Sequence, residues 1–165
     1  MFHCEVIDNS KEKITIEKAQ KFIESQKCGA SLYFLGTVRD HNNDKTVTGI
    51  TYDAHDAMVK KSFKEIYEDA IKKLKLEHPV AFVEHVKGYV PLGGISIIIA
   101  VACKHRSQVY EFSRFIIEEI KKKLFAIKKW VICAPEYNGS IPPILSNLLA
   151  WLSISGDDFR NLFNG

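Results

Sequence analysis

Two long stretches of the sequence place apolar residues three or four positions apart, the spacing that gathers them on one face of an α-helix. The first runs from about Asp56 to Leu76 and the second from Ser107 to Lys123. The apolar stripe of the first is Val59, Phe63, Ile66, Ala70 and Leu74, and that of the second is Val109, Phe112, Ile116 and Ile120. A shorter stretch, Ile14 to Lys27, has the same spacing. We therefore expect two long helices and a short one, each burying one face.

Other stretches have the apolar runs or the alternation of β-strands. The predicted strands are Cys28 to Leu35, Thr48 to Ala54, Val80 to Lys87, Ile95 to Cys103 and, after the last long helix, Lys129 to Ala134. Ile95 to Cys103 does not alternate, which indicates a strand buried on both faces. Thr37 to Lys45 and Gly88 to Gly94 carry turn residues and are predicted loops. Because the order lacks regular β-α-β units, the sequence favours an α+β fold.

The length of 165 residues is typical of one domain, and we expect a single domain over 1–165. From Pro135 the sequence changes character, with Pro142-Pro143, an apolar segment and a polar end. The apolar segment has the stripe of a helix at Ile144, Leu145, Leu148, Leu149 and Leu152. A stripe of this kind must be buried on the chain's own core or on a neighbouring chain.

Composition narrows the class of protein. With 46% hydrophobic and 26% charged residues the chain is an ordinary globular protein, and a net charge of +3 is too small to favour nucleic acid as its main partner. The four cysteines form no C-x-x-C pair, so neither a disulfide framework nor a zinc site is expected from them. Met1 to Ser10 lacks the layout of a signal peptide, and no apolar run is long enough to span a membrane. These features predict a cytoplasmic protein with reduced thiols.

The four arginines are few enough for their positions to be informative. His105 and Arg106 directly follow the buried strand Ile95 to Cys103, at the start of a predicted helix whose free N–H groups favour an anion. Arg39 follows another apolar run, across Gly36-Thr37-Val38. Arg39, His105 and Arg106 are therefore predicted to meet in one pocket for a phosphate or carboxylate. The alternative is that these residues are solvated in loops.

A lysine cluster ends the second long helix at Lys121-Lys122-Lys123, and Lys128-Lys129 follows. Cations at a helix C-terminus offset the helix dipole, which is a sufficient structural reason for their presence. If instead a lysine of each cluster turns toward the arginines, its pKa is lowered by the neighbouring cations and it becomes a candidate general acid or nucleophile.

Other common sites lack support. There is no G-x-G-x-x-G, no G-K-[ST] and no H-E-x-x-H motif. His41 and His55 flank one predicted strand, but no third ligand stands at metal-binding spacing, so we expect no metal. A Cys–His nucleophile pair stays open, although Cys103 lies in the buried strand and is expected to be inert.

Several short segments of the sequence form a pattern when they are taken together. The segments are Gly36-Thr37-Val38-Arg39-Asp40-His41-Asn42, Thr48 to Ala54 with Met58 opening a helix, His85 to Gly93, Ile95 to Cys103 followed by His105-Arg106-Ser107, the helix from Val109 to Lys121, and Lys128. Their order and spacing resemble the large, catalytic subunit of molybdopterin synthase. The resemblance spans roughly Cys28 to Lys128, and its strength comes from the combination of short motifs.

The resemblance implies an α+β fold of the type described as a hammerhead, with a mixed or antiparallel sheet. It also implies a sulfurtransferase in molybdenum cofactor biosynthesis. Such an enzyme moves sulfur from the C-terminal Gly-Gly thiocarboxylate of a small ubiquitin-like subunit to cyclic pyranopterin monophosphate, forming the dithiolene of molybdopterin without a cofactor. A homodimer with one small subunit at each end, a heterotetramer, is implied as well. By position, Arg39, His105 and Arg106 would bind the substrate, and Lys121 and Lys128 would be catalytic.

The sequence also departs from the family pattern. Ala126-Ile127 precede Lys128 where an aromatic residue is usual, and Lys129-Trp130-Val131 follows where a Glu-rich segment is usual. The divergent tail, 135–165, replaces a charged tail that donates an arginine to the partner's pocket. An alternative is therefore a non-catalytic binding module on the same fold. The register also leaves Lys122 as an alternative to Lys121.

Overall fold

The computed structural model describes residues 1–24, 27–42 and 45–125, and its compact unit is Met1–Lys123. The elements in chain order are β1 (Phe2–Asp8), α1 (Ile16–Ile23), β2 (Ala30–Thr37), β3 (His41–Asn42), β4 (Lys45–Thr46), β5 (Gly49–Tyr52), α2 (Asp56–Leu74), β6 (Val80–Pro91), β7 (Ile95–Cys103) and α3 (Arg106–Phe125). The α+β class is confirmed. Lys128, the predicted strand Lys129 to Ala134 and the tail 135–165 lie outside the described residues, so the single domain over 1–165 stays a prediction.

One mixed sheet organises the unit, with strands in the order β1-β6-β7-β2. β1 runs parallel to β6, while β6 and β7, and β7 and β2, are antiparallel. β6 is long enough to pair with β1 along one part and with β5 along the part that follows, from Gly88 to Pro91. β3 and β4 form a separate hairpin. The central strands β6 and β7 therefore each pair with a neighbouring strand on both sides.

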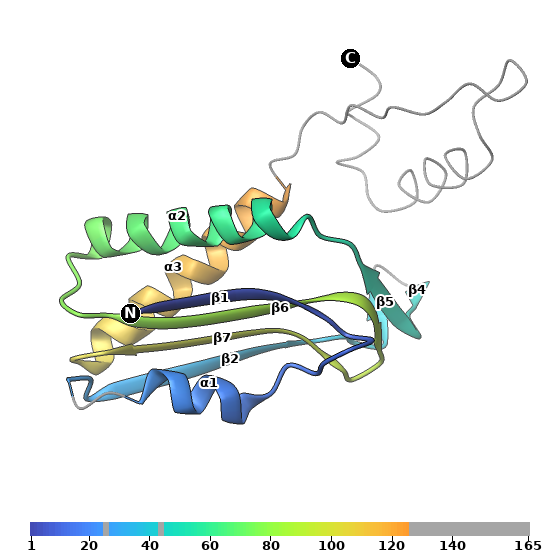
Figure 1. The fold of residues 1–165 in the computed structure, drawn as a ribbon, viewed down its shortest axis with the longest axis horizontal. Coiled ribbons are helices and arrows are strands. Elements are labelled where there is room, and N and C mark those ends of the chain that lie inside the picture. The colour runs from blue at the N-terminus through green and yellow to red at the C-terminus, as the bar shows by residue number, and fades with distance from the viewer. Residues whose placement is uncertain (25–26, 43–44, 126–165) are drawn as a thin grey trace, which may run out of the picture. The chain divides into compact units, whose positions relative to one another are not determined.

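Helices cover both faces of this sheet (Figure 1). α2 and α3 lie on one face, where Phe63 and Ile66 of α2 and Phe112 of α3 belong to one core cluster. α1 lies on the other face, where Ala19 and Ile23 belong to a second cluster. Residues 98–103 of β7 are all buried, as expected of a strand covered on both faces.

Side chains cap the first two helices. The Thr15 hydroxyl accepts from the backbone N–H of Lys18 at 3.4 Å at the start of α1, and His55 Nδ1 accepts from the N–H of Met58 at 3.4 Å at the start of α2. Each contact satisfies a donor that has no partner inside the helix. No helix in the described part of the chain is long and apolar enough to cross a membrane.

The structure also corrects the sequence expectations. β1 was not expected, and the predicted loop Thr37 to Lys45 contains the last residue of β2, all of β3 and the first residue of β4. β6 continues to Pro91 through part of the predicted loop Gly88 to Gly94, because β5 pairs with that extension. Ile50, in the predicted strand Thr48 to Ala54, is 36% exposed, since β5 lies at the margin of the sheet.

Candidate functional site

Arg39 comes two residues after the end of β2, where the chain lies beside the turn that joins β6 to β7. The N–H of Val38 donates to the carbonyl of Gly94 at 3.0 Å, and the N–H of Gly93 donates to the carbonyl of Val38 at 2.8 Å. The Val38 side chain is buried. These contacts hold the backbone just before Arg39 against the turn between β6 and β7. The side chain of Arg39 is exposed.

His105 and Arg106 follow β7 at the start of α3. Arg106 is the first residue of the helix, and the N–H of His105 donates to the side-chain oxygen of Gln108 at 3.3 Å. Both side chains are exposed. The beginning of β2 lies beside this point, because a Cβ added to Gly29 would meet the carbonyl oxygen of Lys104 at 2.8 Å. An exposed imidazole and guanidinium at a helix N-terminus can hold an anion.

The prediction that Arg39 meets His105 and Arg106 in one pocket is wrong within a single chain. β2 and β7 are antiparallel, with Ala30 opposite Cys103 at one end and Thr37 opposite Ile95 at the other. His105 and Arg106 follow the first end and Arg39 follows the second. The seven residue steps between these pairs correspond to about 24 Å along the strand, beyond the reach of two side chains toward each other.

The lysine cluster at the end of α3 separates into paired and unpaired members. Lys122 Nζ donates to Glu119 at 2.8 Å, a contact that raises the pKa of Lys122. Lys123 Nζ donates to Glu65 of α2 at 2.7 Å. Lys121 is exposed and has no ion pair among the residues that the structure describes. Of these three lysines, Lys121 is the one whose amine is available to an anion.

The segment from His85 to Gly93, which also carried the resemblance, makes internal contacts. The Nδ1–H of His85 donates to the carbonyl of Val86 at 2.6 Å, and burial lowers the pKa of His85, which favours the neutral ring. Lys87 Nζ donates to both carboxylate oxygens of Asp56 at 3.0 and 2.9 Å, which raises the pKa of Lys87. The contact of Lys87 with Asp56 connects the start of α2 to β6. Residues of this segment therefore have a role in the fold that does not require a role in binding or catalysis.

The histidines and the cysteine that were weighed as alternatives have structural explanations. His41 Nδ1 lies 2.6 Å from its neighbour Asp40, and His55 caps α2. Neither belongs to a metal-like group among the described residues. Cys103 is 1% exposed, and desolvation raises the pKa of its thiol to about 11. The thiolate, which is the nucleophilic form, is therefore scarce near neutral pH, as expected for an inert cysteine.

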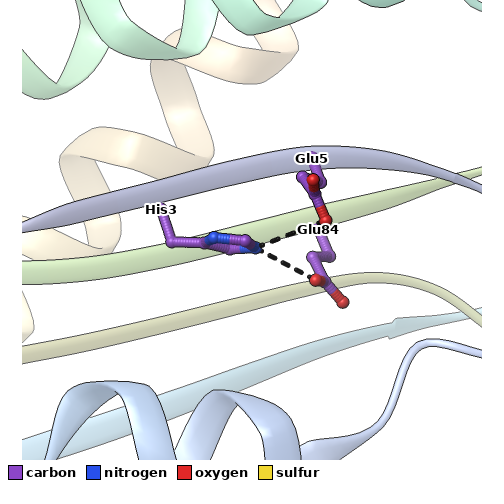
Figure 2. Close-up of side chains that lie close together, drawn as sticks. All are labelled: His3, Glu5 and Glu84. Carbon is purple, nitrogen blue, oxygen red and sulfur yellow. Dashed lines mark hydrogen bonds and ion pairs between the residues drawn. The ribbon is translucent and has the colours of Figure 1, made fainter.

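A cluster that sequence reasoning missed lies where β1 and β6 pair. His3 Nε2 is 3.1 Å from Glu84 Oε1 and 3.9 Å from Glu5 Oε2 (Figure 2). The ammonium of Lys18, on α1, lies 2.7 Å from the same Glu84 oxygen. The side chain of Glu84 is completely buried, and its second oxygen, Oε2, has no hydrogen-bond partner among the described residues. We call His3, Glu5 and Glu84 the His3 cluster.

Comparison with known proteins identifies the family. The model of the MoaE protein family matches residues 9–123, which is more than half of the chain. The chain belongs to the MoaE family. Among its relatives, the molybdopterin synthase catalytic subunit of Pyrococcus abyssi is 30% identical over 126 residues, which cover 76% of this chain and 84% of the relative. The human molybdopterin synthase catalytic subunit is 32% identical over 125 residues, covering 76% of this chain and 65% of the relative.

Solved structures agree with this family assignment. Molybdopterin synthase from Staphylococcus aureus has the same fold, with a TM-score of 0.65, 24% identity, and coverage of 72% of this chain and 82% of that one. The complex of subunits 1 and 2 of the molybdopterin-converting factor from Helicobacter pylori matches with a TM-score of 0.57 and 25% identity, over 72% of this chain and 77% of that one.

The extent of the family match matters for the site. It includes Arg39, His105, Arg106 and Lys121, whereas Lys128 lies beyond it and outside the described residues. The match spans 34% of the Drosophila sechellia and Drosophila melanogaster relatives and 65% of the human one, thus less than two thirds of each.

Proposed function

We propose that this MoaE-family chain is the catalytic subunit of a molybdopterin synthase, a sulfurtransferase. In this proposal it transfers sulfur from the C-terminal thiocarboxylate of a small ubiquitin-like subunit to cyclic pyranopterin monophosphate. The observation that carries the proposal is the pair His105 and Arg106 at the N-terminus of α3, in a chain whose family match covers that whole region. The names of the relatives, molybdopterin synthase catalytic subunits, support this reaction.

The cationic residues suit the charges of the reactants. The precursor carries a phosphate and the sulfur donor is a thiocarboxylate, so both reactants are anions. Bringing them together requires cations and hydrogen-bond donors. His105 and Arg106, which are exposed residues at a helix N-terminus, would hold the phosphate and the pterin together with Arg39. An acidic small subunit would be attracted by the lysines at the other end of α3.

Lys121 and Lys128 would act on the sulfur donor. A lysine amine can protonate a leaving oxygen, or it can hold an acyl group during transfer. The pairing of Lys122 with Glu119 and of Lys123 with Glu65 supports Lys121 over Lys122 in this role. No metal or redox group is required for sulfur transfer of this kind.

The separation of Arg39 from His105 and Arg106 leads us to propose that two copies of the chain build each site. In a homodimer with twofold symmetry, Arg39 of one copy can approach His105 and Arg106 of the second copy, and the symmetric site forms at the same time. The antiparallel register of β2 and β7 supports this arrangement, because it prevents one copy from assembling all three residues.

The activity test mixes the purified chain with a thiocarboxylated small subunit and the precursor, and measures molybdopterin. Lys121→Ala and Lys128→Ala should each abolish turnover. Lys121 is exposed, so Lys121→Ala should also unfold at the same temperature as the wild type, because an exposed lysine contributes less than about 0.5 kcal/mol to stability. Lys122→Ala is the matched control and should keep its activity. Absence of product with the wild-type chain would refute the proposal and favour a binding module on this fold.

The two-copy site has its own test, which uses Arg39→Ala and Arg106→Ala. Each variant alone should be inactive. When the two variants are unfolded and refolded together, random pairing makes half of the dimers mixed, and each mixed dimer regains one of its two sites. About a quarter of wild-type activity should return. If every site instead used residues of one copy only, mixing would restore nothing.

A further inference from the structure

The strand pairing of β1 with β6 explains how the His3 cluster forms. His3 and Glu5 are two positions apart on β1, so both side chains lie on the same face of the sheet. β1 runs parallel to β6 with Glu5 opposite Glu84, which brings the third side chain to that face. The His3 ring stacks on Phe82 of β6, with the ring centroids 4.6 Å apart, and this contact orients the imidazole. Two paired strands therefore hold one imidazole and two carboxylates together.

We propose that the His3 cluster is a binding site for a divalent transition-metal ion, with Zn²⁺ as the best fit. The ligands would be His3 Nε2 and one carboxylate oxygen each from Glu5 and Glu84. The fourth position of a tetrahedral ion would be left to water or to a ligand from solution. The proposal does not depend on the proposed function, because the cluster shares no residue with Arg39, His105, Arg106, Lys121 or Lys128.

The distances within the His3 cluster are close to those that zinc requires. Bonds of about 2.0–2.1 Å at tetrahedral angles place neighbouring ligand atoms roughly 3.3 Å apart. His3 Nε2 lies 3.1 Å from the Glu84 oxygen and 3.9 Å from the Glu5 oxygen. All three ligand atoms lie within 4.8 Å of one another. Small side-chain movements, with no change in the strands, would therefore complete the coordination.

Glu84 supplies a separate argument for a missing ligand. Its side chain is 0% exposed, and its Oε2 has no partner in the described structure. A buried carboxylate oxygen without a hydrogen bond or an ion is unfavourable, so such groups are rare in folded proteins. A metal ion bound by Oε1, the oxygen that faces His3 in Figure 2, would neutralise this buried carboxylate. A carboxylate that was needed only for packing would have been better replaced by an apolar side chain.

Lys18 is the group that competes with the metal. Its ammonium lies 2.7 Å from Glu84 and 3.6 Å from each of Glu5 and Glu12. The cluster in the present structure is thus already organised around a cation. The Lys18 side chain is 38% exposed, so it can move to solvent when a metal arrives. Once the ammonium has moved, the carboxylates of Glu5 and Glu84 leave two negative charges at the His3 cluster, which match a divalent ion.

The donor set favours zinc over the lighter divalent ions. Mg²⁺ and Ca²⁺ prefer oxygen ligands only, whereas imidazole nitrogen suits Zn²⁺ and its neighbours among the transition metals. A bound ion would join β1 to β6 at the cluster. Its effect on folding would follow mass action, so the stability of the chain would rise with free Zn²⁺.

The test is a calorimetric titration of Zn²⁺ into the untagged full chain after treatment with a chelator, since a histidine tag would add metal ligands. The wild type should bind one Zn²⁺ per chain. Glu84→Gln and His3→Gln, which preserve size, should each weaken binding at least about tenfold. Lys18→Met should strengthen it, on the order of tenfold, because the competing ammonium is gone. Glu68→Gln, which removes an exposed carboxylate of α2, is the matched control and should bind like the wild type.

Two readouts decide the outcome. Circular dichroism of each variant establishes that the chain is folded. Co²⁺ in place of Zn²⁺ should give the strong visible absorption of a four-coordinate site in the wild type, Lys18→Met and Glu68→Gln, but not in Glu84→Gln or His3→Gln. The proposal is overturned if the wild type binds no Zn²⁺ at micromolar concentration. It is equally overturned if folded His3→Gln binds Zn²⁺ as well as the wild type does, since the imidazole would then not be a ligand.

Discussion

Replacing Lys18 with methionine should lower the free energy of unfolding of the metal-free chain by about 2 kcal/mol. Removing one partner of a fully buried ion pair costs about 3–5 kcal/mol, because the other charge stays buried and unpaired. The Glu84 side chain is fully buried, but that of Lys18 is 38% exposed. Water already screens part of the attraction, and His3, which lies 3.1 Å from the same oxygen, can still contact it in the variant. The expected cost is therefore below the fully buried range.

Replacing the other partner of the ion pair, as in Glu84→Gln, should lower the free energy of unfolding by much less, about 0–1 kcal/mol. The amide oxygen can still accept from Lys18, and no buried charge is left without a partner. For the same reason, the double variant Lys18→Met/Glu84→Gln should be about 1.5 kcal/mol more stable than the sum of the two single effects predicts. Replacing the buried Glu84 is thus expected to reduce stability less than replacing the partly exposed Lys18, which is the opposite of what burial alone suggests.

Urea unfolding at neutral pH with a chelator gives the free energy of unfolding of the wild type, the two single variants and the double variant. A loss of 2 kcal/mol corresponds to a shift of about 1 M in the midpoint. Lys64→Met is the matched control: Lys64 forms an exposed pair with Glu68 at 4.0 Å, and its loss should cost less than about 0.5 kcal/mol. The reasoning fails if Lys18→Met costs no more than this control, or if the two single effects add.

The stability of the chain at alkaline pH is a second measure of the Lys18–Glu84 pair. The hydrogen bond with Glu84 raises the pKa of Lys18 above its ordinary value of 10.5. A raised lysine pKa stabilises the fold fully below the unfolded value, and the contribution is lost as pH rises through the folded value. The stability difference between the wild type and Lys18→Met should therefore be constant from neutral pH to about pH 10 and shrink above 10.5. A difference that disappears at lower pH would contradict the assigned partner.

Three further predictions follow from burial and backbone geometry. Phe112→Ala should destabilise the chain by about 3–5 kcal/mol, measured by urea unfolding, because its ring is 0% exposed in the core beneath α3. Cys4 and Cys103 should resist thiol labelling at pH 8 until the chain unfolds, as peptide mass spectrometry can show, because burial raises both pKa values to about 11. Gly88→Ala should cost about 1–2 kcal/mol in thermal unfolding, since Gly88 has a φ of +94° and an added Cβ meets no closer atom than one at 4.0 Å, which leaves backbone strain as the only cost.

The helices were predictable because their pattern depends only on neighbouring residues. All four apolar positions expected in α3 are buried, and α2 begins at Asp56 and ends at Leu74, within two residues of the predicted end. The ends of α2 also have local causes, namely the His55 cap and the left-handed conformation of Lys75. The strand Ile95 to Cys103 was predicted with its exact bounds, because a buried central strand is apolar along its whole length.

The His3 cluster could not be predicted, because it depends on a pairing between strands that are far apart in the sequence. β1 alternates as Phe2, Cys4 and Val6 on one face and His3, Glu5 and Ile7 on the other. The available signal was the spacing of His3 and Glu5, two positions apart within an alternating segment. Its meaning depends on Glu84, which the parallel register with β6 supplies.

The failed prediction about Arg39 has a topological cause that also bears on function. Both Arg39 and the pair His105-Arg106 follow strands, and in a parallel sheet the ends of neighbouring strands share one edge. β2 and β7 are neighbours, but they run in opposite directions, so the same local signal marks opposite ends of the sheet. A sequence contains no local information about this direction. Motifs of one family can thus be placed correctly along the chain and still not form a site within one copy. The mixed-variant experiment examines this point, because it returns activity only if the residues that topology separates within a copy meet between copies.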